Sequence, residues 1–509
     1  MTELEMYELW CTLRLWANYN QLNQTIEKNW LSNSFNSHIL DLLDKEEIKY
    51  RSEKRLLGYR NKGKRRLAGN ANQPIIINID DVADVIDVRA EDEFARVELL
   101  VSLKQELERL SPRELMIIRT YLDYPIEVVA RKLKGRPNTI FRALQHGYVV
   151  ASPAIRGRVQ KGADGRYNGK APSCVVDYKA AVRYLHFFAD ELPGDASKII
   201  TNGTSAGGAL SSLMGSTGNH PDYEPYLQAL GAADAGDNVF AASCYCPITN
   251  LEHADMAYEW EFCGVNDFHR ANMKMDEGGR PVFTPVDGEM TKEQILVSAE
   301  EKAMFPAYVN SLGLKDENGD PLTLDADGEG SLKEYVKRVV MESAQRASDQ
   351  GVDLSDKPWL IVENGKVQGM DFTAYVKDIT RMKTAPAFDA LDLESPENDL
   401  FGNETTNCRH FTEYSTAHTK AQGACAEAEV VKMMNPMEYI MDEKAEKAQH
   451  FRIRHGECDR DTSLVISAML VLKLREAGCE VDYHSPWNTP HAGDYDLDEL
   501  FAWIDGICG

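Results

Sequence analysis

Residues 199–208 read Ile-Ile-Thr-Asn-Gly-Thr-Ser-Ala-Gly-Gly, a short apolar strand pattern followed by a glycine-rich turn and the start of a helix pattern. The turn contains Gly-x-Ser-x-Gly in the strand–turn–helix setting that a nucleophile elbow requires. Gly203 and Gly207 allow the sharp bend that raises the Ser205 hydroxyl above the sheet. The helix start directs the Ala206 N–H toward a developing oxyanion. An ordinary glycine-rich turn is the alternative interpretation, but we expect a nucleophile.

Strand and helix patterns alternate on both sides of this turn. We predict strands over residues 147–151, 199–201, 239–243, 451–454 and 481–483, and helices over 174–192, 209–214, 464–476 and 497–507. Such alternation is typical of a mostly parallel sheet covered by helices on both faces. The segment from about 250 to 437 interrupts the alternation and is too long for a loop, so we expect an inserted domain there.

A serine is a poor nucleophile at neutral pH and needs a base and a group that orients the base. With this elbow, the chain order is serine, then an acid, then histidine. Asp459 follows the predicted strand 451–454, and His491 follows the predicted strand 481–483. These positions predict Asp459 as the orienting acid and His491 as the base. His455 and His484 are competing bases.

Several longer motifs resemble those of bacterial tannases. They are Gly203-Thr204-Ser205-Ala206-Gly207-Gly208, Gly218-Asn219-His220-Pro221, the run Asn-Leu-Glu-His-Ala-Asp-Met-Ala-Tyr-Glu-Trp at 250–260, Arg381-Met382-Lys383, Ser395-Pro396-Glu397-Asn398 and the C-terminal stretches. The resemblance covers residues 141–509. It implies an α/β-hydrolase with a large inserted lid that cleaves esters of gallic acid. It also implies a triad of Ser205, Asp459 and His491.

The same resemblance implies that Lys383, Glu397 and Asp461 bind the galloyl hydroxyls. A trihydroxyphenyl ring presents three donors in a row, which carboxylates accept, and a lysine supplies a donor in return. The fungal tannase and feruloyl esterase pattern does not fit, because Thr204 and Pro490 occupy the places of its paired cysteines.

No cofactor or metal is expected. Cys244-Tyr245-Cys246 lacks the further pair of ligands that a zinc site needs, so we interpret it as part of a buried strand.

The composition excludes several classes of protein. The 509 residues are 43% hydrophobic and 27% charged, which excludes a disordered chain, and no uncharged apolar run is long enough to span a bilayer. The N-terminus is acidic where a secretory signal is basic, and the ten cysteines are too scattered for a disulfide scaffold. We therefore expect a cytoplasmic protein with reduced thiols and no membrane partner.

The N-terminal region differs from the rest in charge and pattern. Residues 1–140 contain 22 basic and 22 acidic side chains, so the whole formal charge of −25 lies in residues 141–509, which argues against nucleic acid as the substrate there. Residues 1–138 read as mostly helical. Around Leu110-Ser111-Pro112-Arg113-Glu114 they resemble the promoter-reading helix-turn-helix of bacterial sigma-70-type factors, and a plain helical hairpin is the alternative.

The opening of the hydrolase sheet is not found in residues 1–140. They contain no Gly-Gly pair for the loop that supplies the second oxyanion N–H, and they show little strand pattern. Loss of one oxyanion donor lowers turnover by on the order of 10²–10³. A genuine fusion, a recombined gene and an assembly artefact are open explanations.

These observations combine into one prediction of fold and function. We expect a helical region at 1–138, a truncated α/β-hydrolase core at 139–250 and 438–509, and a lid domain at 251–437. The expected function is a serine esterase acting on galloyl esters. The alternative is a catalytically impaired, tannase-like chimera whose helices in 1–138 bind DNA or RNA polymerase.

Overall fold

The computed structural model describes residues 137–275 and 281–509. Residues Pro153–Asp496 form one compact unit. The described residues before Pro153 belong to a second unit together with Leu497–Ile507. The predicted sigma-like region at 1–138 lies outside the described residues, apart from the first two residues of helix α8 (Pro137–Gln145).

The second unit contains α8 and α20 (Leu497–Cys508). Helix α20 confirms the helix predicted over 497–507. The strand predicted over 147–151 is wrong. These residues have no neighbouring strand among the described parts of the chain, and the Tyr148 hydroxyl donates to Asp505 of α20 at 2.5 Å instead. An apolar run becomes a strand only where a second strand takes up its backbone N–H and C=O groups.

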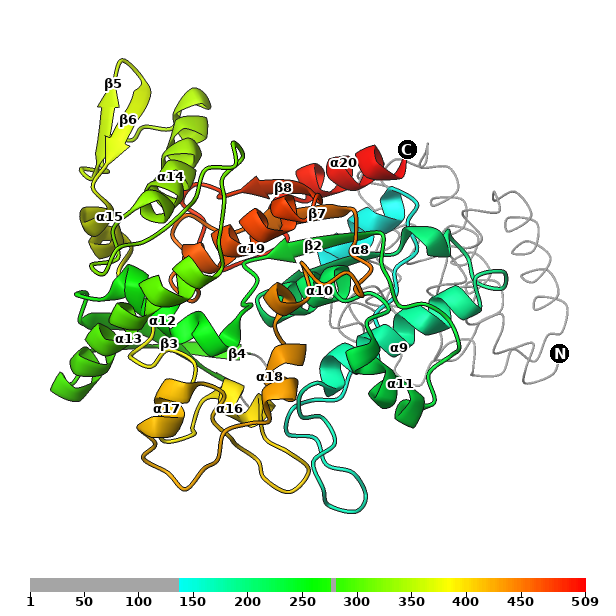
Figure 1. Ribbon diagram of the computed structural model, residues 1–509. Helices are drawn as coiled ribbons and strands as arrows, with labels where there is room; N and C mark the ends of the chain where they lie inside the picture. The colour runs from blue at the N-terminus through cyan, green and yellow to red at the C-terminus, as the bar shows by residue number, and fades with distance from the viewer. Residues whose placement is uncertain (1–136, 276–280) are drawn as a thin grey trace, which may run out of the picture. The chain divides into compact units, whose positions relative to one another are not determined.

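A four-stranded parallel sheet lies at the centre of the main unit (Figure 1). Its order is β1 (Ile200–Thr204), β2 (Ala241–Tyr245), β7 (His450–Arg454) and β8 (Glu480–His484). All five residues of β2 are buried, as expected for an inner strand covered on both faces. The four strands predicted in these places are confirmed. Since the strands are parallel, their carboxyl ends share one edge, and the following loops begin there.

Helices pack on this sheet. Helix α10 (Ala206–Ser216) contacts β1 and β2, and α19 (Leu464–Glu476) contacts β8. Ten of the 13 residues of α19 are buried, since it is apolar on almost every side. The remaining helices of this part are α9 (Ser173–Phe187), α11 (Glu224–Leu230) and the short 3-10 turns Ala196–Lys198 and Pro221–Tyr223.

The insertion after β2 forms its own helices and two hairpins (Figure 1). Its elements are α12 (Leu251–Phe262), β3 (Asp267–Met275), β4 (Pro281–Glu289), α13 (Lys292–Ser311), α14 (Ser331–Asp349), β5 (Leu360–Glu363), β6 (Lys366–Met370), α15 (Phe372–Ile379), α16 (Pro396–Leu400), α17 (Glu413–Ala417), α18 (Ala428–Met433) and the 3-10 turn Pro436–Glu438. Helices α12 and α14 both contact α19, so the insertion packs directly on the core. Within the insertion, Arg381 and Glu259 form a fully buried ion pair, with a guanidinium nitrogen 2.6 Å from the Glu259 Oε1.

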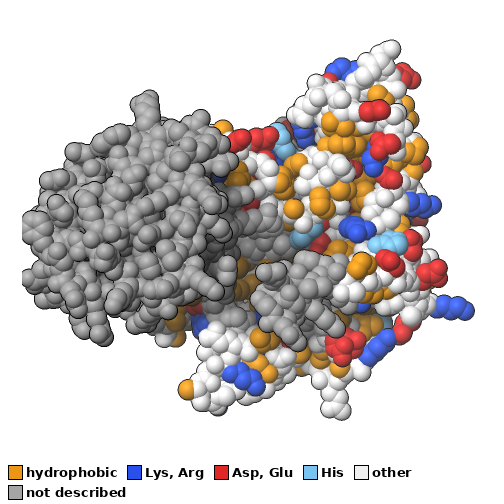
Figure 2. All heavy atoms as spheres, turned by 180° about the vertical axis from the view of Figure 1, so that it is seen from behind, with side chains coloured by type: hydrophobic (Ala, Val, Ile, Leu, Met, Phe, Trp, Pro, Cys, Tyr) orange, Lys and Arg blue, Asp and Glu red, His pale blue; other side chains and the backbone are white. Residues whose placement is uncertain are grey.

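One face of the described surface is mixed in charge (Figure 2). On the face seen in Figure 2, acidic and basic side chains are interspersed. Among residues 137–275 and 281–509, no helix is long and apolar enough to cross a membrane.

Candidate active site

Ser205 stands between β1 and α10 in a strained conformation. Its φ is +59°, which a non-glycine residue adopts only when its surroundings enforce it. The Ser205 N–H donates to the Tyr245 carbonyl of β2 at 2.9 Å and so ties the turn to the sheet. A Cβ on Gly203 would lie 2.2 Å from the Gly207 carbonyl oxygen, whereas a Cβ on Gly207 would meet nothing within 4 Å. Only Gly203 of the two is therefore required by close packing.

Ala206 begins α10 directly after the serine. An N–H in the first turn of a helix has no helical carbonyl to bond, so it is available to an oxyanion. The Gly-Gly loop that would supply a second N–H is not found in the sequence of residues 1–140, of which the structure describes only 137–140.

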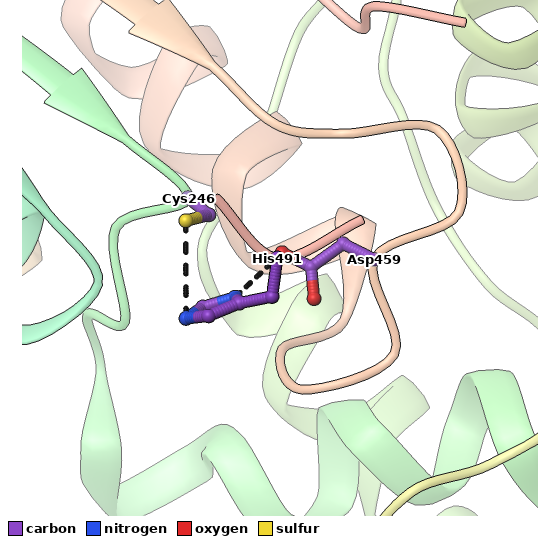
Figure 3. Close-up of side chains that lie close together, drawn as sticks. All are labelled: Cys246, Asp459 and His491. Carbon is purple, nitrogen blue, oxygen red and sulfur yellow. Dashed lines mark hydrogen bonds and ion pairs between the residues drawn. The ribbon is translucent and has the colours of Figure 1, made fainter. Parts of the chain in front are cut away.

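Asp459 and His491 are brought together from the loops after β7 and β8. The His491 Nδ1 lies 2.8 Å from the Asp459 Oδ2 (Figure 3). Asp459 is 2% exposed and also accepts the backbone N–H of Asp461 at 2.8 Å and that of Thr462 at 3.2 Å. Burial opposes ionisation of Asp459, but the charge of His455 and the hydrogen bond from His491 hold its pKa below the ordinary value. Asp459 is therefore held as a carboxylate, which accepts the His491 Nδ1–H and leaves Nε2 facing away from it.

The competing histidines are placed differently. His455 is buried, with its Nδ1 2.9 Å from the Ser467 hydroxyl and its Nε2 3.7 Å from the Asp459 Oδ2. The His484 Nε2 lies 3.2 Å from Asp482. Of the three histidines, His491 is thus the one that is hydrogen-bonded to Asp459.

The serine and the imidazole are not joined in this structure. Among the described residues, no hydrogen bond links the Ser205 hydroxyl to His491. The neighbour of the His491 Nε2 is instead the Cys246 thiol, at 3.9 Å (Figure 3). The sequence reasoning missed Cys246 because it was interpreted as a strand residue, whereas β2 ends one residue earlier. Its position directly after a strand was the available signal.

Two of the three predicted galloyl-binding residues form an ion pair. The Lys383 Nζ lies 2.6 Å from the Asp461 Oδ1, and both side chains are partly exposed. The Lys383 ammonium also lies 3.9 Å from the centre of the Phe388 ring. Glu397 lies in the first turn of α16, close enough to Lys383 and Asp461 for their charges to affect its pKa. Burial raises the pKa of Glu397, while Lys383 lowers it and Asp461 raises it further.

Tyr258 of α12 connects the segment that contains Lys383 with the loop that contains Asp461. Its buried hydroxyl accepts the backbone N–H groups of Met382 at 3.2 Å and Lys383 at 3.1 Å, and it donates to the Arg460 carbonyl at 2.8 Å. It thereby holds the lysine segment of the insertion against the loop that contains Asp461. The sequence reasoning quoted the motif containing Tyr258 but assigned it no role.

Three side chains at the site are of types that can bind a metal ion. Cys246, Asp459 and His491 each offer one atom, and these atoms lie within 4.8 Å of one another.

Comparisons with known proteins converge on one kind of enzyme. A family model described as BD-FAE matches residues 130–282. A solved tannase from Lactobacillus plantarum is 47% identical, with a TM-score of 0.72, over 74% of this chain and 80% of that one. A Fusobacterium nucleatum tannase is 45% identical, with a TM-score of 0.69, over 73% of this chain and 80% of that one.

The chain is also similar to an enzyme solved with a bound ester and, over a short stretch, to a curated esterase. A tannin acyl hydrolase solved with ethyl gallate is 47% identical, with a TM-score of 0.70, over 74% of this chain and 80% of that one. Esterase LipC of Mycobacterium tuberculosis is 35% identical over 88 residues, which are 17% of this chain and 22% of LipC. The chain thus matches about a fifth of the length of that curated relative.

Proposed function

The chain belongs to the tannase family, and on this premise we propose that it hydrolyses galloyl esters with Ser205 as nucleophile, His491 as base and Asp459 as orienting acid. One observation carries the assignment. The His491–Asp459 hydrogen bond of 2.8 Å lies at the carboxyl edge of the sheet, the same edge from which the elbow raises Ser205.

The reaction proceeds in two acyl-transfer steps. The Ser205 oxygen attacks the ester carbonyl while the His491 Nε2 takes its proton, and the Ala206 N–H donates to the oxyanion. The C–O bond to the alcohol then breaks, and His491 returns the proton to the leaving alcohol. A water, deprotonated by His491, attacks the galloyl-enzyme and releases gallic acid and free Ser205. Catalytic hydrogen bonds are commonly long before substrate binds, and we expect the Ser205–Nε2 bond to form in the complex.

The insertion at 251–437 serves as the lid and supplies half of the ring pocket. Lys383 and Glu397 come from the insertion, and Asp461 comes from the core loop beside Asp459. The carboxylates accept from the phenolic hydroxyls and the lysine donates to one phenolic oxygen. An ester without ring hydroxyls makes none of these hydrogen bonds and is disfavoured.

A matched pair of serine variants tests the proposal. The wild-type chain and Ser212→Ala, a buried serine of the same helix, should release gallate from methyl gallate. Ser205→Ala should release none above the buffer rate. A wild-type chain that unfolds cooperatively but releases no gallate would exclude the esterase. Gallate release by Ser205→Ala at the wild-type rate would exclude Ser205 as nucleophile.

The alternative function, binding of DNA or RNA polymerase by residues 1–138, has no support in the comparisons, and only residues 137 and 138 of that region are described. The cytoplasmic location stays a prediction from the scattered cysteines.

A further inference from the structure

The Cys246 thiol has no part in the proposed hydrolysis, yet it lies beside the nitrogen that must take up the serine proton. Its sulfur is 3.9 Å from the His491 Nε2 and 3.3 Å from the Ala492 carbonyl oxygen, to which it donates (Figure 3). The other ring nitrogen, Nδ1, bonds Asp459 at 2.8 Å. When Nδ1–H donates to a carboxylate, the Nε2 lone pair is free and faces the sulfur.

The backbone fixes this position of the thiol. Cys246 has a φ of +35°, which is strained for a non-glycine residue. Its N–H donates to the Arg454 carbonyl of β7 at 2.6 Å, so the residue is bound to the neighbouring strand. The side chain is buried, and the contact with His491 is built in by the sheet rather than made by a mobile surface group.

The spacing fits two ligands of a tetrahedral metal. Zinc bonds of about 2.3 Å to sulfur and about 2.0–2.1 Å to nitrogen place the two ligand atoms about 3.6 Å apart at a tetrahedral angle. The observed 3.9 Å requires a shift of about 0.3 Å or a modestly wider angle. Asp459 then takes the place of the carboxylate that commonly orients a metal-bound histidine through its other nitrogen.

We propose that Cys246 Sγ and His491 Nε2 together bind a thiophilic divalent cation of the zinc class, with Asp459 holding the imidazole and solvent filling the other positions. The thiol releases its proton to solvent as the metal–sulfur bond forms. The consequence for activity rests on the proposed function. A metal on Nε2 occupies the lone pair that takes the Ser205 proton, so zinc inhibits reversibly until a chelator removes it.

Binding is tested with Co²⁺, because a thiolate ligand gives cobalt a charge-transfer absorption in the near ultraviolet that needs no turnover. The wild-type chain should show this band, and Zn²⁺ should displace it. The band should be lost in both Cys246→Ser and His491→Ala. It should persist in Cys425→Ser, which removes an exposed cysteine of the insertion. Thermal unfolding of each variant confirms that it is folded.

Inhibition is tested by titrating Zn²⁺ against methyl gallate hydrolysis. Cys246→Ser should raise the zinc concentration for half-inhibition at least about tenfold relative to wild type and Cys425→Ser. Absence of the cobalt band in the folded wild-type chain, or its persistence in Cys246→Ser, overturns the metal site. An inactive wild-type chain that still shows the band separates failure of the esterase from failure of the metal site.

Discussion

Replacing Tyr258 by Phe removes one oxygen that joins the lysine segment of the insertion to the acidic loop of the core. Three hydrogen bonds are lost, two from the N–H groups of Met382 and Lys383 and one to the Arg460 carbonyl. At about 0.5–1.5 kcal/mol net for each bond, the free energy of unfolding should fall by about 1.5–4.5 kcal/mol. Because Lys383 is then held less firmly against Asp461, KM for methyl gallate should rise about tenfold, equivalent to about 1.4 kcal/mol.

The assay combines urea unfolding with kinetics on methyl gallate and methyl benzoate. Benzoate has no ring hydroxyls, so its KM should stay unchanged in Tyr258→Phe. The control is Tyr223→Phe, because this fully buried hydroxyl donates to the Met433 carbonyl at 2.6 Å and touches neither Lys383 nor the acidic loop. Tyr223→Phe should lower the free energy of unfolding by about 1 kcal/mol and leave both KM values unchanged. An unchanged KM for methyl gallate in a destabilised Tyr258→Phe would refute the positioning role.

Three more expectations concern the elbow, the ring pocket and a buried acid. Gly203→Ala should abolish activity because its Cβ would lie 2.2 Å from a carbonyl oxygen, whereas Gly207→Ala, with open space around its Cβ, should keep most of it; comparable losses in the two would contradict this packing argument. Lys383→Met should lower kcat/KM for methyl gallate about 10- to 100-fold without affecting methyl benzoate, since a charged hydrogen bond is worth about 1.5–3 kcal/mol. Burial raises the pKa of Glu261 to about 7 from an unfolded value of 4.5, although hydrogen bonds from Ser463 and the next N–H lower it. The folded chain therefore binds more protons than the unfolded one between these pH values, and stability should fall with rising pH by up to about 3 kcal/mol. Urea unfolding at pH 5 and pH 8 should show a smaller fall in Glu261→Gln than in wild type, and an equal fall would reject the assignment.

Local sequence patterns were sufficient to predict most of the sheet and one of its covering helices. The predicted bounds of the helix at 464–476 are those of α19, and the strands at 199–201, 239–243, 451–454 and 481–483 were placed within a few residues. These segments carry their own signals, namely dense apolar runs bounded by turn residues. The elbow was equally local, because its glycines and serine lie within five positions.

What the sequence did not reveal depends on contacts between distant segments. Residues 147–151 have the composition of a strand, but a strand also needs a neighbour, and no local pattern reports one. The thiol of Cys246 meets His491 across 245 positions of the chain. Tyr258 acts on segments 124 and 202 residues away, so its role appears only once three elements are packed together.

The Asp461 N–H donates to the Asp459 carboxylate, so under the proposed function one tripeptide serves both acid–base chemistry and ring recognition. An inserted or deleted residue there would damage both tasks at once, which leaves this loop little freedom to diverge. A different acyl preference is easier to obtain by substituting Lys383 and Glu397 of the insertion, because these substitutions do not move the imidazole of His491. Exchanging the insertion between related enzymes is therefore the practical route to hydrolysing differently substituted aromatic esters with the same catalytic residues.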